Sequence, residues 1–221
     1  MGHVSTTSQH FCELGSSMLV AQRDGELCDF ELVCNGQSML LHKIIICLQS
    51  PEASGRYEMK DCDFNSVRRM VRFLYTGDYR PGKSGKVYEV AVHIAMFALA
   101  DKYLIKGLLA LSRAYFSEAV AKENDMNILS QHAKQVYDLE FESSKCLRKI
   151  LIQSFIKRIA RPAAKIDMPQ SLDRLMAEVP EFARDMAMAY IRQPCLACAR
   201  KEQNSPLQMA VAKKRRISEN P

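Results

Sequence analysis

The sequence predicts an α+β fold that begins with a β-hairpin, leads directly into a helix and continues almost entirely as helices. Three observations support this prediction. Residues Phe30 to Cys34 alternate in polarity, and the Asn35-Gly36 pair that follows is the strongest short signal for a two-residue hairpin turn. At His42 the period of apolar residues changes from two to the helical value. Apolar residues at helical spacing then recur through most of residues 64–191.

The hairpin and the helix after it are expected within residues 28–51. The second strand is predicted at Gln37 to Leu40, running back along the first. The helix is predicted to end at Ser50-Pro51, because the residue before a proline avoids the helical region. We expect this helix to be buried through one apolar stripe, made of Ile44, Ile45, Cys47 and Leu48.

A second group of signals predicts a brief strand and a strongly amphipathic helix. The strand is expected at Glu58 to Asp61, and Asp63 has the side chain of a good helix N-cap. Gly77 is expected to end that helix in the left-handed conformation. The apolar stripe of the helix comprises Phe64, Val67, Met70, Val71, Leu74 and Tyr75.

Five further helical segments are expected, at residues 87–103, 104–120, 124–139, 143–159 and 170–191. Pro180 is predicted to restart a helix within the last of them, since proline is favoured at a first helical position. The predicted organisation is a flexible N-terminus (1–22) with at most a short helical lead-in at Phe11 to Val20, an α+β domain (23–122), a helical extension (123–193) and a disordered basic tail (194–221).

Charge and composition exclude several function classes. The net charge is +6, but residues 194–221 carry six Lys or Arg and only two acidic residues, so the body is nearly neutral. We therefore expect no direct nucleic-acid binding by the body. No run of 18 apolar residues predicts a membrane span. Met1 to Gln9 lacks a signal-peptide core, and the eight scattered cysteines are interpreted as reduced thiols, so a cytoplasmic or nuclear location is expected.

Four short motifs occur in a characteristic order along the chain: Cys28-Asp29-Phe30-Glu31-Leu32, Leu41-His42-Lys43, Phe73-Leu74-Tyr75-Thr76-Gly77-Asp78-Tyr79 and Ala100-Asp101-Lys102-Tyr103. Together they resemble the BTB/POZ domain, in the version common in filamentous fungi, over about residues 20–122. The resemblance implies a BTB/POZ-like fold, a small sheet with flanking helices, here followed by an all-α C-terminal extension. It also implies protein–protein association, in many members as homodimers, and in some members as a link between a cullin ubiquitin ligase and its substrate.

The resemblance implies a charged pocket at the dimer axis, in which Asp29 and Lys43 occupy the family's acidic and basic positions. We assign Asp29, His42 and Lys43 to a candidate interaction pocket. The alternative for the pair is that Asp29 caps a strand start and Lys43 lies on a helix surface. His42 is interpreted as a buried histidine bonded to backbone and not as a catalytic base, and the same interpretation is given to His93 and His132.

The chain departs from the family pattern between Pro51 and Glu58. The family usually carries a helix and a loop there, and its cullin-binding acidic motif lies in that region. Here only Glu52 to Tyr57 remain. We therefore expect a protein–protein interaction module that binds a second copy or another protein. A substrate adaptor of a cullin-type ubiquitin ligase and a nuclear, transcription-linked scaffold are the two alternatives.

The remaining motifs do not indicate an enzyme. Arg80 to Lys86 lacks the order of a phosphate-binding loop, so no cofactor or small-molecule substrate is expected. Cys195 and Cys198 have metal-ligand spacing, but no second ligand pair stands nearby, so free thiols are favoured over a zinc site. Lys213, Lys214, Arg215 and Arg216 form a candidate nuclear-import signal, with a solvated basic tail as the alternative.

Overall fold

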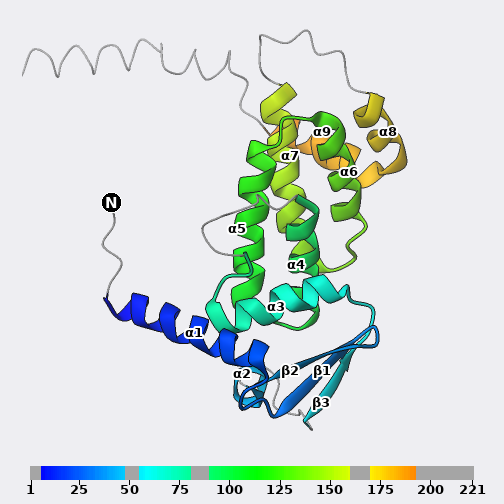
Figure 1. The fold of residues 1–221 in the computed structure, drawn as a ribbon. Coiled ribbons are helices and arrows are strands. Elements are labelled where there is room, and N and C mark those ends of the chain that lie inside the picture. Colours follow the sequence, from blue (N-terminus) through cyan, green and yellow to red (C-terminus); the bar gives the residue numbers. More distant parts are fainter. Residues whose placement is uncertain (1–5, 48–54, 81–89, 160–169, 193–221) are drawn as a thin grey trace, which may run out of the picture.

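The computed structural model describes residues 6–47, 55–80, 90–159 and 170–192. Figure 1 shows a small sheet at one end of the molecule, with α3 lying across it, α4 and α5 rising from α3, and α6 to α9 at the far end. The elements in chain order are α1 (Thr6–Asp24), β1 (Phe30–Cys34), β2 (Gln37–Leu41), α2 (Lys43–Cys47), β3 (Arg56–Met59), α3 (Phe64–Thr76), α4 (Val90–Lys102), α5 (Lys106–Lys122), α6 (Met126–Tyr137), a 3-10 turn η1 (Glu142–Ser144), α7 (Lys145–Ile159), α8 (Gln170–Glu178) and α9 (Pro180–Ile191).

The predicted hairpin is confirmed. β1 and β2 pair antiparallel from Phe30 opposite Leu41 to Cys34 opposite Gln37. Asn35 and Gly36 both have positive φ, +50° and +75°, as a tight turn of this kind requires. β3 pairs parallel to β1 and gives the strand order β2-β1-β3. It occupies Arg56 to Met59, two residues earlier than the strand predicted at Glu58 to Asp61.

The helix α1 is longer than the sequence predicted. The helical lead-in expected at Phe11 to Val20 is confirmed, but the helix runs from Thr6 to Asp24, so the prediction of a flexible chain is wrong for residues 6–10 and 21–22. Leu19 is buried between α1 and the rest of the domain. Gly15 lies against α3, where a Cβ on it would come within 2.3 Å of the Tyr75 carbonyl oxygen. Packing against α3 therefore supports a helix that its own serine, threonine and glycine residues favour only weakly.

The prediction of a fully buried helix after the hairpin is also wrong in part. α2 comprises only five residues, Lys43 to Cys47. Ile45 and Ile46 are half-buried against the core, but 67% of Ile44 is exposed. Cys47 is the last residue of α2. Leu48, the last residue of the predicted apolar stripe, lies outside the described residues. Ile44 therefore lies on the solvent side of α2, whereas Ile45 and Ile46 lie toward the core.

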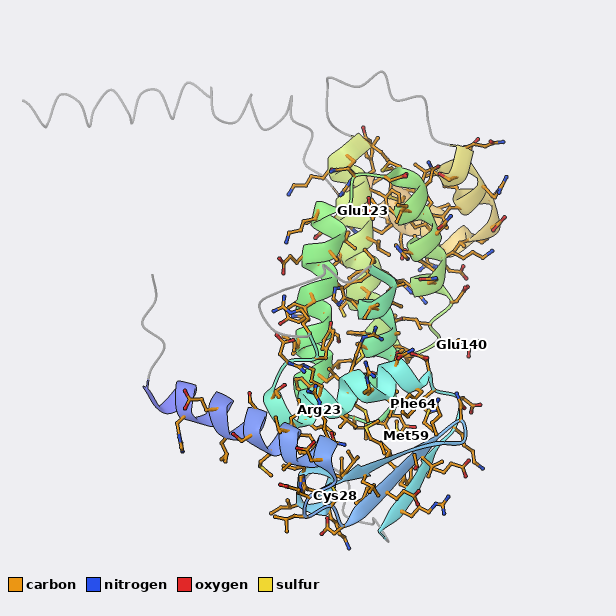
Figure 2. The ribbon with its side chains drawn as sticks, viewed as in Figure 1. Arg23, Cys28, Met59, Phe64, Glu123 and Glu140 are labelled. Carbon is orange, nitrogen blue, oxygen red and sulfur yellow. The ribbon has the colours of Figure 1, made fainter. Side chains whose placement is uncertain are left out.

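The amphipathic helix α3 agrees with its sequence signals. The Asp63 carboxylate accepts a hydrogen bond from the backbone N–H of Ser66, and Gly77 ends the helix with a φ of +74°. The buried side chains of α3 pack into one apolar cluster with β1 and β3. Figure 2 shows Met59 and Phe64 in the space between the sheet and the helices. The cluster holds Phe30, Leu32, Cys34, Met59, Val67, Met70, Val71 and Tyr75 among others.

Two apolar clusters meet at α4, which explains why its sequence is apolar on all sides. Met96 and Leu99 belong to the cluster around the sheet, whereas Ile94 and Phe97 belong to a second cluster formed with α5 to α9. The last predicted helix divides into α8 and α9, and Pro180 begins the second as expected. No helix in the described part of the chain has the length and apolar character needed to cross a membrane.

Candidate interaction surface

The candidate pocket residues lie where the chain leaves the sheet to form α2. His42 is buried between two partners: its Nε2 lies 2.9 Å from the Glu26 carbonyl oxygen, and its Nδ1 lies 2.8 Å from the Tyr75 hydroxyl. The backbone N–H of His42 also donates to the Tyr75 hydroxyl at 2.9 Å. As the interpretation of a buried histidine predicts, His42 holds the β2–α2 junction to the end of α1 and to α3.

Asp29 and Lys43 are neighbours, but they meet through a side chain of one and the backbone of the other. The Asp29 carboxylate accepts a 2.6 Å hydrogen bond from the backbone N–H of Lys43, at the start of α2. Both residues are exposed, and within the described residues no ion pair joins their side chains. Asp29 therefore satisfies a free helical N–H, and the Lys43 ammonium is left in solvent. Their role in a pocket between two protomers stays a prediction.

Three large apolar side chains surround this junction and lie in solvent. The exposed fractions are 90% for Leu27, 51% for Leu40 and 67% for Ile44. The backbone segments that carry them are tied together, because Glu26 bonds to His42, Asp29 bonds to Lys43, and the Asp29 N–H donates to the Leu41 carbonyl at 3.1 Å. We call these three residues the junction face: Leu27, Leu40 and Ile44. An exposed apolar patch beside polar groups is typical of a protein interface.

The backbone of Leu27 has an unusual conformation for a leucine. Its φ is +54°, in the left-handed region that costs an L-residue with a Cβ about 1–2 kcal/mol. Glycine or asparagine is the usual residue at such a position. A leucine that is both strained and almost wholly exposed gains no compensating contact from its own domain. Leu104 shows the same combination, with a φ of +56° and 83% of it exposed, so it is the further exposed apolar residues Leu40 and Ile44 that distinguish the surroundings of Leu27.

Helix α1 extends the exposed surface beyond the junction face. Figure 1 shows its C-terminal end beside α2 and its N-terminal half projecting from the body. Leu14 and Val20, with exposed fractions of 50% and 54%, add apolar surface along the helix. The projecting half of α1 and the exposed apolar side chains thus lie at the same end of the molecule.

No direct signal in the sequence indicated the junction face. Leu27 follows Arg23-Asp24-Gly25, which reads as an ordinary turn, and Ile44 was assigned to a buried stripe. One signal could have pointed to an exposed apolar surface there: Leu27 is a leucine just after a turn, where a polar residue is expected.

The other sequence-derived candidates fall into two groups. The buried histidines have side-chain partners: the His93 Nδ1 lies 2.6 Å from the Tyr79 hydroxyl, and His132 lies 3.2 Å from Gln135 Oε1. Cys195, Cys198 and the basic run 213–216 lie outside the described residues. In the part of the chain that is described, no group of three or more His, Cys, Asp or Glu side chains is arranged to hold a metal ion.

Comparison with known proteins identifies the N-terminal half of the chain. The family profile described as BTB/POZ domain matches residues 19–119, which run from the end of α1 to the last turns of α5. No curated protein matches the sequence. Among solved structures, the chain is similar to the BTB domain of zebrafish PATZ1, with 18% identity, a TM-score of 0.41, and coverage of 53% of this chain and 99% of that chain.

Proposed function

Because residues 19–119 form a BTB/POZ domain, which is a protein–protein interaction module, we propose that the chain binds a second copy of itself through the junction face and α1. The fold is one of protein association and not of an enzyme family. Burial of apolar surface against the second copy is the driving force, and the exposed charges of Asp29 and Lys43 add specificity more than affinity.

The observation that supports this proposal best is that Leu27 is exposed together with two further large apolar residues, Leu40 and Ile44, around the β2–α2 junction. The Leu27 side chain is 90% exposed, and its φ of +54° strains the backbone without any gain inside the protomer. A two-fold interface places the same patch of each copy against the other, so Leu27, Leu40 and Ile44 would be buried twice. Full burial of such side chains contributes about 1.5–3 kcal/mol each, which exceeds the local strain.

The test uses Leu27→Asn in the full chain. Asparagine accepts a positive φ, so this substitution relieves local strain and removes the apolar contact at the same time. We expect the variant to fold at least as stably as the wild type at low concentration and to dimerise more weakly by sedimentation equilibrium. A structural role of Leu27 within the protomer predicts a different result, in which dimerisation is unchanged.

Leu104 provides a matched control. It is also a leucine with positive φ, +56°, and 83% of it is exposed, but it lies between α4 and α5 and outside the junction face. Leu104→Asn makes the same chemical change without touching the proposed interface. We expect it to leave the dimer intact. Equal weakening by both substitutions, or a monomeric wild type, would contradict the proposal.

The narrower roles expected from the resemblance stay predictions. Residues 52–57 stand where the family carries a longer segment, and of these 52–54 lie outside the described residues. The basic run 213–216 also lies outside them. Co-purification with a cullin tests the adaptor role. Replacement of Lys213 to Arg216 by alanine tests the nuclear scaffold and its location, and an unchanged nuclear location would count against it. The filamentous-fungal type also stays a prediction.

A further inference from the structure

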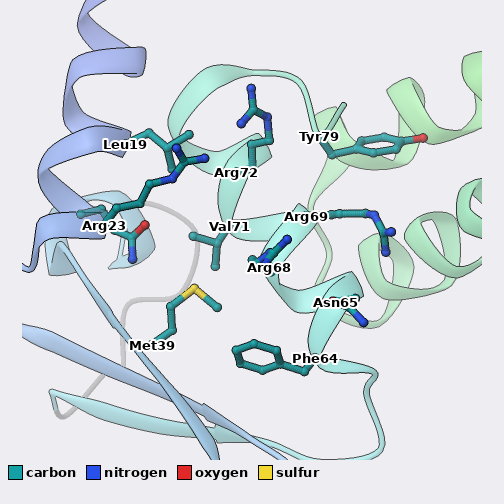
Figure 3. Close-up of a pocket in the computed structure, with 11 residues that line it drawn as sticks. Leu19, Arg23, Met39, Phe64, Asn65, Arg68, Arg69, Val71, Arg72 and Tyr79 are labelled. Carbon is teal, nitrogen blue, oxygen red and sulfur yellow. The ribbon is translucent and has the colours of Figure 1, made fainter. Parts of the chain in front are cut away.

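A groove runs between α1 and α3 on the side of the domain that Figure 3 shows in close-up. Its volume is about 600 Å³, which is room for several side chains of a partner. Arg23 enters it from α1, and Arg68, Arg69 and Arg72 enter it from α3. No carboxylate lines the groove among the described residues. Four guanidinium groups therefore meet in one concave site whose lining holds no carboxylate, and the Asp63 carboxylate outside the lining acts on Arg69.

Three of these guanidinium groups are available to a ligand. In the described part of the chain, Arg23 and Arg68 form no hydrogen bond or ion pair with protein groups. Arg72 uses its Nε to donate to the Arg80 carbonyl oxygen at 2.9 Å, which leaves its terminal N–H groups open. Arg68 and Arg72 stand one helical turn apart, so they present two forks on one face. This spacing suits carboxylates that follow one another on a peptide.

The groove also has an apolar base. Leu19 and Val71 are buried beneath it with exposed fractions of 8% and 1%. Met39 from β2 and Phe64 from α3 are half-buried along its lower side in Figure 3. A ligand that matches both features carries carboxylates beside an apolar side chain. A phosphate backbone supplies the negative charge but has no apolar side chain for Met39 and Phe64.

We propose that this groove binds an acidic segment of a partner protein, in which Asp or Glu residues flank an apolar side chain. The inference rests on the proposed function as an interaction module, and it adds a second surface with its own chemistry. The basic segment 194–221 of this chain carries the wrong charge to occupy the groove. The occupant is therefore a different protein, bound by charge-assisted hydrogen bonds to arginine and by burial of one apolar anchor.

The test is selection from a library of random 12-residue peptides displayed on phage, with the immobilised full chain as bait. We expect the selected peptides to be enriched in Asp and Glu around a Leu, Ile, Phe or Met. The affinity of a selected peptide for Arg23→Glu/Arg68→Glu should be at least about tenfold lower than for the wild type, because two charge-assisted contacts become repulsive. Arg23→Gln/Arg68→Gln should weaken binding by a smaller factor, and it serves as the milder variant if charge reversal impairs folding.

Arg174→Glu/Arg184→Glu is the matched control. Both residues are exposed, and they lie on α8 and α9 at the far end of the molecule. This variant has the same net charge as the groove variant and should bind the selected peptides as the wild type does. Peptides without acidic enrichment, or equal weakening by both variants, would overturn the proposal. A random single-stranded DNA that binds more tightly than the peptides, and that the groove variant loses, would overturn it in favour of nucleic acid.

Failure of this proposal is distinguishable from failure of the dimer proposal. Arg68→Glu/Arg72→Glu changes the groove on α3 alone and leaves α1 as it is, so this variant should retain the wild-type sedimentation behaviour while it loses the peptides. Leu27→Asn should retain the peptides while it loses self-association. If one substitution abolished both properties in a folded protein, the two surfaces would not be separate, and the assignment of the groove to a different partner would be wrong.

Discussion

The Tyr75 hydroxyl oxygen lies between the backbone and the ring of His42, at 2.9 Å from its N–H and 2.8 Å from its Nδ1. Because the hydroxyl accepts from the backbone N–H, its own hydrogen is free to be donated to Nδ1. The ring then carries its proton on Nε2, which donates to the Glu26 carbonyl at 2.9 Å. One tautomer thus satisfies both ring nitrogens of His42 and its backbone N–H.

Tyr75→Phe is expected to destabilise the protein by about 1–3 kcal/mol, because the buried N–H and Nδ1 of His42 both lose their partner. Urea unfolding measures this loss. Tyr190→Phe removes a hydroxyl from a side chain that is 67% exposed and should change the free energy of unfolding by less than about 0.5 kcal/mol. Equal effects of the two substitutions would show that the His42 contacts contribute no stability.

Gly15→Ala sets two opposite effects against each other. Alanine is favoured over glycine inside a helix by about 1 kcal/mol. At Gly15, however, a Cβ would come within 2.3 Å of the Tyr75 carbonyl oxygen, which belongs to the backbone and has no rotamer to adopt. We expect the clash to prevail, so that the variant is less stable than the wild type and α1 exchanges its amide hydrogens faster.

Ser17→Ala is the control for Gly15→Ala, since Ser17 lies on the same helix and is exposed. There no clash opposes the propensity effect, and the exposed hydrogen bond that is lost, from the Ser17 hydroxyl to the Glu13 carbonyl oxygen, contributes little, so the substitution should be close to neutral or stabilising. Amide hydrogen exchange across α1 and urea unfolding report the two effects. Stabilisation by Gly15→Ala would mean that α1 does not pack on α3 as described.

His93 predicts a pH dependence of stability. It is buried against Tyr79 and Tyr115. Burial and the positive charge of Arg80 lower the pKa of His93 from 6.5 to about 4, although the negative charge of Glu118 acts in the opposite direction. As the pH falls from 6.5 toward 4, the unfolded chain therefore takes up a proton that the folded chain does not. The stability of the wild type should fall over this window, by at most about 1.4 kcal/mol per pH unit for one proton.

His93→Gln isolates this effect, because glutamine does not titrate and can still bond to the Tyr79 hydroxyl. Between pH 6.5 and 4 the variant should lose less stability than the wild type, whatever the difference between the two at pH 7. Urea unfolding at several pH values gives both slopes. Parallel curves would contradict the depressed pKa of His93.

The sequence was most informative where a single residue decides the local backbone. Asn35-Gly36 fixed the hairpin, and Asp63 and Gly77 fixed the two ends of α3, because each has a backbone or capping preference that few other residues share. The start of α9 at Pro180 followed in the same way. These signals are local, so no knowledge of the tertiary structure was needed.

The features missed depend on contacts between distant segments. α1 is stabilised by the fit of Gly15 and Leu19 to α3, which lies about fifty residues further along the chain. The arginine groove exists only because α1 brings Arg23 opposite Arg68 and Arg72. No backbone preference of leucine predicts the left-handed φ of Leu27. Resemblance placed Asp29 near Lys43, but only coordinates show that the contact is to the backbone N–H.

Cross-linking at Lys43 tests self-association most directly. Lys43 is exposed beside Ile44 in the junction face, and a link from Lys43 to Lys43 can form only between two copies of the chain. An isologous interface brings the same face of both copies together. Mass spectrometry after treatment of the full chain with an amine-reactive cross-linker should therefore find this homotypic link, and Leu27→Asn should reduce it while Leu104→Asn does not. Absence of the Lys43–Lys43 link in the wild type, with the protein sedimenting as a monomer, would contradict the account.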